Sequence, residues 1–303
     1  MTAAVPGVDD VLTLGDLGAD GNDLGPLTSP VLLVALTGWF DAAGVATAAL
    51  DHLTRGAVTI GEIDPDPFYD FTQERPTIEI EGGDVRAITW PANAFRVVRT
   101  GSAHDLVVLS GVEPHLAWST FAGCVLRIVD RLGCDAVVTL GATADPVPHT
   151  RMPLVVGSTA SPGLARKLGL SAPTYQGITG VIGVLHAELE RIEVPTISLR
   201  VGIPHYLTHA EHPLAVSALL RHVSHVLGLP VTVDLREQVA RWSALHDEAV
   251  ADDDRLRAYV AMLESDYDRH AEETLTAADD LGSRFEEFLR EEGENGSDEA
   301  GDR

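Results

Sequence analysis

Short continuous apolar runs separate polar turns through the first two thirds of the chain, and the clearest pair frames one helix. Leu106–Leu109 ends in the polar turn Ser110–His115, a helix is predicted over Trp118–Leu132, and Asp135–Leu140 forms a second apolar run. Continuous apolar runs of this length are typical of strands buried on both faces. Two such strands joined by a helix predict a right-handed βαβ unit.

The same pattern repeats on both sides of this unit. Further strands are predicted at Val11–Leu14, Val31–Leu36, Ala57–Ile63, Phe95–Arg99, Leu154–Ser158 and Pro195–Val201. Helices are predicted at Ala42–Thr54, Ser161–Leu168 and from Gly180 to about Ile192. Ile78–Ile80 and Arg86–Trp90 flank a turn-forming segment, 81–84, which predicts a hairpin. Strands that alternate with helices predict a three-layer α/β sandwich with a mainly parallel sheet.

No strand pattern returns after His212, and helical periodicity takes its place. Helices are predicted over Pro213–Leu227, Thr232–His246 and Asp254–Phe288, which together form a C-terminal all-helical appendage. In the last of these, Leu256, Tyr259, Val260, Leu263 and Tyr267 recur at helical spacing, so one face is expected to dock on another surface. The predicted division is a flexible arm (1–30), an α/β core domain (31–211), a helical C-terminal region (212–290) and a disordered acidic tail (291–303).

Charge and composition exclude several classes of partner. The formal net charge of the 303 residues is −25, which opposes nucleic acid and anionic membrane surfaces. The first residues lack the order of a signal peptide, and no apolar run has the length of a bilayer span. Cys124 and Cys134 have no metal-ligand or redox spacing and are expected to be reduced packing residues. These features predict a cytoplasmic protein.

The loops after the predicted strands are the first place to look for chemistry, because ligands in such sheets bind beyond the carboxyl ends of the strands. Asp41, Glu113, Asp145 and His149 fall in these loops and could supply an acid–base group set. The alternative is structural, with Asp41 as a helix N-cap and Glu113 fixing a turn through backbone N–H groups. We favour the structural interpretation, since such loops need caps whether or not they are catalytic.

The usual catalytic and cofactor motifs are mostly absent from the sequence. The chain has no G-x-S-x-G sequence, and Gly177-x-x-Gly180-x-x-Gly183 is not a dinucleotide fingerprint. Lys167 lies in no phosphate-binding loop, so no cofactor is expected. His205, His209 and His212 come closest to metal-ligand spacing, but Pro204 and Pro213 bracket them. We interpret them as loop and helix-cap residues and predict no metal site, with a zinc site as the alternative.

Seven motifs, in this order, give the chain a family resemblance. They are Gly38–Gly44, Asp64–Pro65 with Tyr69–Phe71, Arg75–Pro76, Gly111–Pro114, Gly141–Ala142 with Asp145–Arg151, Tyr175–Gly180 and Val201–Tyr206. Together they resemble the prokaryotic branch of the proteasome assembly chaperone 2 family, over about 31–263. The resemblance implies a sandwich similar to nucleoside phosphorylases, a helical C-terminal addition and a homo-oligomer. The eukaryotic members of the family act as assembly chaperones for the proteasome α-ring.

The motifs also supply candidate binding residues, which are Trp39, Tyr69, Arg75, Tyr175, Thr179, His205 and Tyr206. From the resemblance and the missing catalytic motifs we expect a non-enzymatic, cytoplasmic, assembly-chaperone-like oligomer with a protein partner. The alternative is a hydrolase or transferase on a nucleoside-phosphorylase-like scaffold, with an acid–base site in the strand-end loops. Because fold does not determine function, that alternative rests on analogy.

Overall fold

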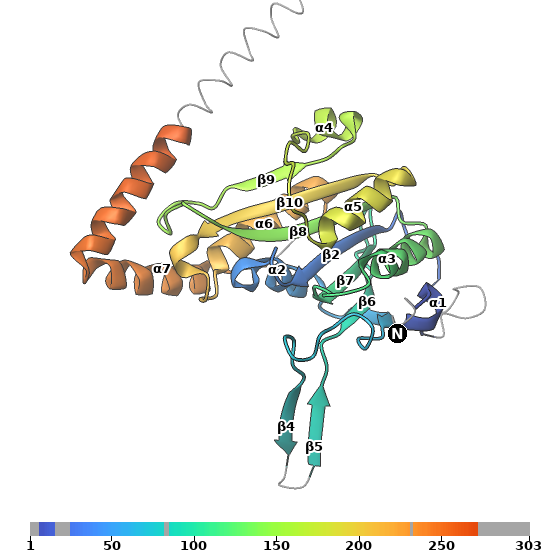
Figure 1. Ribbon diagram of the computed structural model, residues 1–303. Coiled ribbons are helices and arrows are strands. Elements are labelled where there is room, and N and C mark those ends of the chain that lie inside the picture. Colours follow the sequence, from blue (N-terminus) through green and yellow to red (C-terminus); the bar gives the residue numbers. More distant parts are fainter. Residues whose placement is uncertain (1–5, 16–24, 82–84, 231–232, 272–303) are drawn as a thin grey trace, which may run out of the picture.

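An eight-stranded sheet lies between two layers of helices in the computed structural model of the chain, which describes residues 6–15, 25–81, 85–230 and 233–271 (Figure 1). The strand order is β1-β3-β6-β7-β2-β8-β10-β9. The strands are β1 (Leu12–Leu14), β2 (Val31–Thr37), β3 (Val58–Ile63), β6 (Asn93–Val98), β7 (Leu106–Val112), β8 (Ala136–Asp145), β9 (Val155–Ser158) and β10 (Thr196–Pro204). The helices that accompany the sheet are α1 (Val8–Val11), α2 (Val45–Leu53), α3 (Trp118–Leu132), α4 (Pro162–Leu168), α5 (Val181–Arg191) and α6 (Pro213–Leu227).

The centre of the sheet is parallel and its margins are antiparallel. β7, β2, β8 and β10 pair in parallel, whereas β1, β6 and β9 each pair antiparallel with their neighbours. β3 runs in the same direction as the central four, so most strands share one direction and the predicted three-layer α/β sandwich is confirmed. The predicted βαβ unit is β7–α3–β8, with β2 inserted between its two strands.

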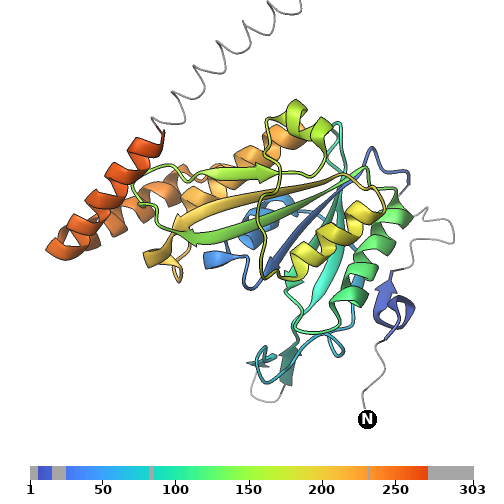
Figure 2. The ribbon, with the colours of Figure 1, turned by 45° about the horizontal axis from the view of Figure 1, so that its top comes forward.

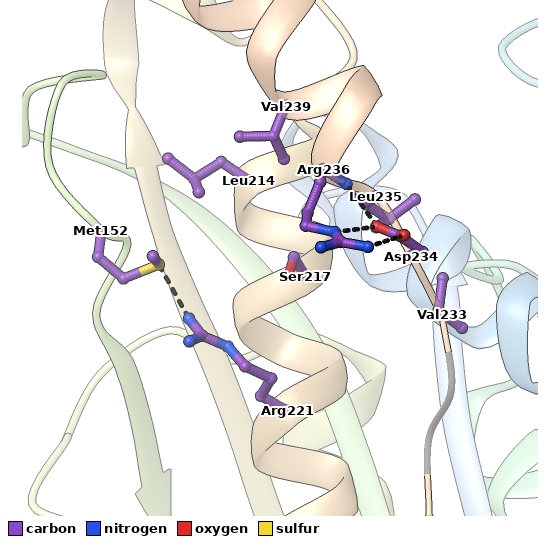
Figure 3. A pocket seen from close by; sticks show the side chains of 9 residues that line it. All are labelled: Met152, Leu214, Ser217, Arg221, Val233, Asp234, Leu235, Arg236 and Val239. Atoms are coloured by element: carbon purple, nitrogen blue, oxygen red, sulfur yellow. Dashed lines mark hydrogen bonds and ion pairs between the residues drawn. The ribbon is translucent and has the colours of Figure 1, made fainter.

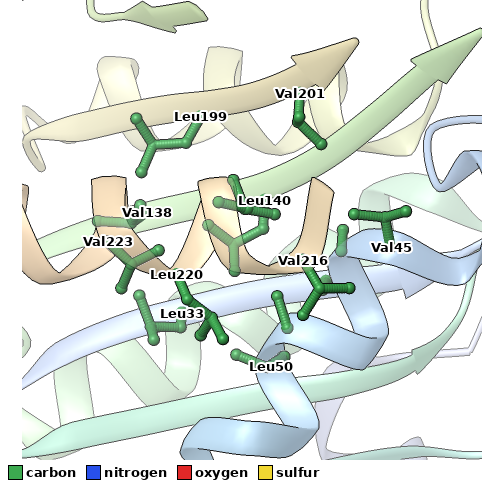
Figure 4. Close-up of a cluster of buried hydrophobic side chains, with 14 of the residues drawn as sticks. Leu33, Val45, Leu50, Val138, Leu140, Leu199, Val201, Val216, Leu220 and Val223 are labelled. Atoms are coloured by element: carbon green, nitrogen blue, oxygen red, sulfur yellow. The ribbon is translucent and has the colours of Figure 1, made fainter. Parts of the chain in front are cut away.

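Each face of the sheet has its own apolar core. In β2, Leu33 and Ala35 face the core under α2 and α6 (Figure 4), while Leu32 and Val34 face the core under α3 and α5. This alternation explains why the strand is apolar at every position, since both faces are covered. Burial of each leucine side chain contributes about 1.5–3 kcal/mol, so the two cores supply most of the stabilisation.

Two further elements project from the body (Figures 1 and 2). β4 (Thr77–Glu81) and β5 (Val85–Thr89) pair antiparallel as a separate two-stranded sheet, which confirms the predicted hairpin and which we call the β-ribbon. After α6 the chain forms α7 (Arg236–Ala251) and a further helix that begins at residue 254 and is described to residue 271. We call these two helices the helical arm.

The remaining sequence predictions concern the acidic tail, the two cysteines and membrane-spanning segments. Residues 272–303, including the expected acidic tail, lie outside the described residues, and the four-part domain division remains a prediction. Cys124 and Cys134 are free and buried, and burial raises the pKa of the first thiol to about 11 and of the second to about 12. None of the helices in the described residues is long and apolar enough to cross a bilayer.

Candidate functional site

The carboxyl ends of the parallel strands meet at one edge of the sheet, which we call the strand-end edge. Thr37 of β2 pairs with Val112 of β7, and Asp145 of β8 pairs with Pro204 of β10, so each pair ends together and all four strands end at this edge. β3 runs in the same direction and leads at this edge into the chain that reaches the β-ribbon. This is the edge at which α/β sheets bind their ligands.

Asp41 follows β2 at this edge, and its carboxylate is occupied by the start of α2. Its Oδ1 accepts the N–H of Ala46 at 2.6 Å, and its Oδ2 accepts the hydroxyl of Thr47 at 2.6 Å and the N–H of Thr47 at 3.4 Å. Asp41 does not precede the helix directly, because the 3₁₀ turn η2 (Ala42–Gly44) lies between them. Burial raises the pKa of the Asp41 carboxyl, and the hydrogen bonds to Thr47 and Ala46 oppose the rise. Asp41 therefore caps α2, as the structural interpretation predicts.

Glu113 follows β7 and joins two loops. Its Oε2 accepts the N–H of Trp39 at 3.0 Å, and its Oε1 accepts the N–H of Val181, the first residue of α5, at 3.3 Å. Gly38 and Gly180 make room for this carboxylate, because a Cβ atom at either position would lie 2.7 Å from one of its oxygens. The side chain stabilises a helix N-terminus and the loop after β2 at the same time.

Asp145 and His149 are the other two acid–base candidates; Asp145 is the last residue of β8, and His149 lies in the loop that follows it. The described residues show no hydrogen bond to the Asp145 carboxylate, although its backbone oxygen lies 3.2 Å from Nδ1 of His205. His149 is only 2% exposed, and burial lowers its pKa. Its Nδ1 lies 2.8 Å from the hydroxyl of Tyr206 and its Nε2 lies 3.2 Å from Oδ1 of Asp247. Across the described residues, no hydrogen bond or ion pair joins any two of the four candidates.

The helical arm covers the β8–β10 half of the strand-end edge. Trp242 of α7 packs against two imidazoles in a tilted arrangement, with ring centroids 4.2 Å from His212 and 4.5 Å from His246. The Trp242 and His149 rings also meet edge to face, with centroids 6.2 Å apart. Sequence reasoning missed Trp242 and Asp247, because neither belongs to a recognisable motif and their contacts with His149 join residues about one hundred positions apart.

The second helix of the arm is fixed by polar contacts around apolar ones. Arg151 donates from Nε and Nη2 to the two carboxylate oxygens of Asp268, at 2.9 and 2.8 Å, and from Nη1 to Glu264 at 3.1 Å. Val260 and Leu263 are buried beside these contacts, which confirms that this apolar face docks. The sequence pattern found the docking face, but it gave no indication of Arg151.

The β2–β7 half of the edge, by contrast, is open to solvent and apolar. Trp39 is 69% exposed, Leu116 55%, Tyr175 73% and Ile178 83%, and we call these four residues the open strand-end surface. The Glu113 carboxylate brings their loops together, because it accepts the N–H of Trp39 and the N–H of Val181, the residue after Gly180. A Cβ atom on Gly180 would lie 3.6 Å from the Trp39 ring, so Trp39 lies beside the loop that carries Ile178.

The remaining candidate binding residues differ in exposure. Tyr69 is buried, where its hydroxyl donates to the carbonyl oxygen of Val112 at 2.7 Å, and burial raises its pKa. Arg75 and Thr179 are exposed, and Thr179 donates only to the neighbouring carbonyl of Gly180. His205 is exposed but contacts the arm, with Nε2 3.0 Å from the hydroxyl of Tyr259. The Tyr206 hydroxyl, like that of Tyr69, has a partner within the protein, because it lies 2.8 Å from Nδ1 of His149.

The β-ribbon extends the apolar surface beyond the body. Ile78 pairs with Ile88 across the ribbon, so both lie on one face, and Ile80 and Trp90 share that face by alternation. All four are exposed. At the base of the ribbon, the Trp90 and Phe71 rings meet edge to face at 4.9 Å. The opposite face carries Thr77, Glu79 and Thr89, so the ribbon is amphipathic.

The described part of the chain contains no group of three or more histidine, cysteine, aspartate or glutamate side chains arranged to hold a metal ion. The zinc alternative at His205, His209 and His212 therefore finds no support. His212 is buried, where its Nδ1 accepts the N–H of Ala215 at 3.2 Å and caps α6, while His209 is exposed.

Comparison with known proteins gives one matching family and several similar structures. The family model described as PAC2 family matches residues 35–250. A PAC2 family protein from Streptomyces avermitilis is 34% identical, with 76% of this chain and 99% of that chain covered and a TM-score of 0.70. A Mycobacterium tuberculosis proteasome-assembly chaperone homologue is 37% identical, with 76% and 99% covered and a TM-score of 0.69.

A more distant structure shares the fold. The archaeal proteasome activator PbaB from Pyrococcus furiosus is 18% identical, with 80% of this chain and 97% of that chain covered and a TM-score of 0.60. Among curated proteins, none matches the chain.

Proposed function

The chain belongs to the PAC2 family, and from that premise we propose that it is a non-enzymatic, cytoplasmic protein-binding oligomer that acts as an assembly chaperone. One relative at 37% identity is named as a proteasome-assembly chaperone homologue, and a more distant one as a proteasome activator. Each name describes the activity of that relative and not of this chain. The proposal extends that kind of activity to this chain and leaves its partner open.

The observation that carries the proposal is the open strand-end surface. Large apolar side chains that gather on one exposed surface are a mark of protein–protein contact in soluble proteins. Glu113 links the loops that carry Trp39 and Ile178, by accepting the N–H of Trp39 and that of Val181, so the surface is preorganised for a partner. A preorganised surface loses less conformational entropy on association.

The partner should combine an apolar patch with a basic rim. The chain has 46 acidic and 21 basic residues other than histidine, so its overall field attracts positively charged partners. Complementary charge at the rim steers association and opposes acidic partners. The β-ribbon and the helical arm both project from the body, which suits a partner large enough to contact one of them together with the open strand-end surface.

The test is capture of partners from native cytosol by the tagged protein, followed by mass spectrometry. We expect Ile178→Glu to reduce recovery of the captured partner at least fivefold, because a charge in the apolar centre would be desolvated on binding. Ile192→Glu is the matched control, since Ile192 is also exposed but follows α5 at the opposite end of that helix. That variant should retain the partner.

Two results would contradict the proposal. The first is that the wild-type protein recovers only its own subunits. The second is that both glutamate variants retain the partner equally, which would place the contact elsewhere. Both variants alter exposed positions, so equal denaturation midpoints should accompany either result.

The alternative, a hydrolase or transferase with an acid–base site in the strand-end loops, gains no support from the arrangement. The carboxylates of Asp41 and Glu113 accept backbone N–H groups, and His149 lies under the helical arm. A catalytic group must reach the proton that it transfers, and these three have other partners.

A further inference from the structure

A groove lies along α6, and none of its lining residues belongs to the open strand-end surface (Figure 3). Leu214 and Arg221 of α6 form its floor, Val239 of α7 lies on one side, and Met152 of the β8–β9 loop lies on the other. Its volume is about 540 Å³. Pockets for small molecules typically measure about 300–1,000 Å³, so the groove is large enough for one.

The lining is apolar along most of its length. Leu214, Val239 and Met152 contribute aliphatic or thioether side chains, and Val233 and Leu235 continue this wall. Such a lining binds hydrocarbon by removing it from water, at about 25 cal/mol per Å². An apolar lining alone would not define the ligand, but the groove also contains charge.

Arg221 is the cation in the groove without a carboxylate partner among the described residues. Its Nη2 donates to the sulfur of Met152 at 2.9 Å, and a thioether is a weak acceptor. Arg236 lies in the same groove but is neutralised, because its Nε and Nη2 donate to the two oxygens of Asp234 at 2.9 and 2.6 Å. The groove therefore has one guanidinium with donors to offer, at the end opposite Val239.

We propose that this groove binds a small organic anion that consists of one carboxylate and an apolar chain. The planar fork of Arg221 matches the two oxygens of a carboxylate, and the apolar wall receives the chain. One available guanidinium fits one negative charge, whereas the net charge of −25 opposes anions with several charges. The proposal is independent of protein binding at the strand-end edge.

The direct experiment is calorimetric titration of the full chain with decanoate below its micelle concentration. We expect one saturable site. Acetate lacks the apolar chain and decyltrimethylammonium lacks the carboxylate, so neither should bind at the same concentrations. Arg221→Gln should weaken decanoate binding at least tenfold, and Val239→Asn should also weaken it by placing a polar amide in the apolar wall.

Arg241→Gln is the matched control, because it removes the same charge from α7 at a position outside the groove, where Arg241 pairs with Glu237. It should leave decanoate binding within about twofold of wild type. The positions substituted are at most partly buried, and unchanged circular dichroism will verify that each variant is folded. The proposal is wrong if decanoate does not saturate a site, if Arg221→Gln binds it as tightly as Arg241→Gln, or if decyltrimethylammonium binds equally well.

Discussion

At the scale of single residues, Glu113 and Asp145 are two carboxylates at the same edge of the sheet that differ in their hydrogen bonds. Glu113 accepts two backbone N–H groups from separate loops, while the described residues show no hydrogen bond to the Asp145 side chain. Glu113→Gln retains one acceptor oxygen and leaves one N–H without a partner. We expect it to lower the free energy of unfolding by about 1–2 kcal/mol.

Asp145→Asn is the control for this prediction, and its effect should stay within about 0.5 kcal/mol, as for surface substitutions generally. Urea denaturation of the wild-type protein and both variants measures the difference. Equal loss of stability in the two variants would mean that the carboxylate charge, and not the hydrogen bonds of Glu113, determines the effect.

His212 predicts a pH dependence with a definite sign. Burial lowers its pKa from 6.5 to about 4, so between these pH values the unfolded chain binds a proton that the folded chain does not. Stability from this group is complete above pH 6.5 and is lost as the pH falls toward 4. Nearby His149 and His246 act in the same direction, because each further lowers the pKa of His212.

His212→Asn isolates this contribution, because asparagine also caps helices and does not titrate. At pH 7.5 the variant should be less stable, since it loses the ring that stacks on Trp242. The deficit should shrink by up to about 2 kcal/mol between pH 7.5 and pH 5. Guanidinium denaturation at several pH values measures it, and a deficit that is constant with pH would contradict the assignment.

At the scale of elements, Arg151 determines how firmly the second helix of the arm is docked. Arg151→Gln removes the two-oxygen contact with Asp268 and the contact with Glu264. We expect amide hydrogens of residues 254–271 to exchange several-fold faster while those of the sheet are unchanged, because the helix opens locally. Arg257→Gln is the control, since Arg257 pairs with Asp254 within the same helix. Faster exchange in both variants would indicate loss of helix propensity and not loss of docking.

The β-ribbon offers a second prediction at this scale. Isolated two-stranded hairpins are marginally stable in water, so an apolar face on one favours contact with another molecule. Ile78→Thr combined with Ile88→Thr keeps β-branched side chains and makes the paired positions polar. Self-association or partner capture should fall, with little change in the stability of the body. Val58→Thr, an exposed apolar position of β3, is the control in both assays.

What the sequence could predict depended on the range of the interactions involved. The apolar run Val31–Leu36 identifies a buried strand by itself, because both faces of β2 are covered along the whole run. That Asp41 binds the start of α2 was also foreseeable, but its position was not, because Gly44 is the N-cap of α2 and a 3₁₀ turn separates Asp41 from the helix. The docking of α7 was not predictable, since Trp242 is the one buried residue of that helix and the rings it meets outside the helix, His149 and His212, are distant in sequence.

At the scale of the whole molecule, two opposing forces act between copies of the chain. Each copy has a formal charge of −25, so copies repel one another. The open strand-end surface and the apolar face of the β-ribbon favour association by removing exposed hydrocarbon from water. Salt separates the two forces, because it screens the repulsion and leaves the apolar attraction in place.

The expected oligomer should therefore form more readily as salt is added. The screening length falls from about 30 Å at 0.01 M to about 10 Å at 0.1 M ionic strength, which is short compared with the separation of most charges on two associating molecules. We expect the weight-average sedimentation coefficient to rise between 10 and 300 mM sodium chloride at fixed protein concentration. The ribbon double variant should reduce this rise and Val58→Thr should not. A sedimentation coefficient that falls with salt would show that ion pairs hold the copies together, and the apolar surfaces would then remain available to a different protein.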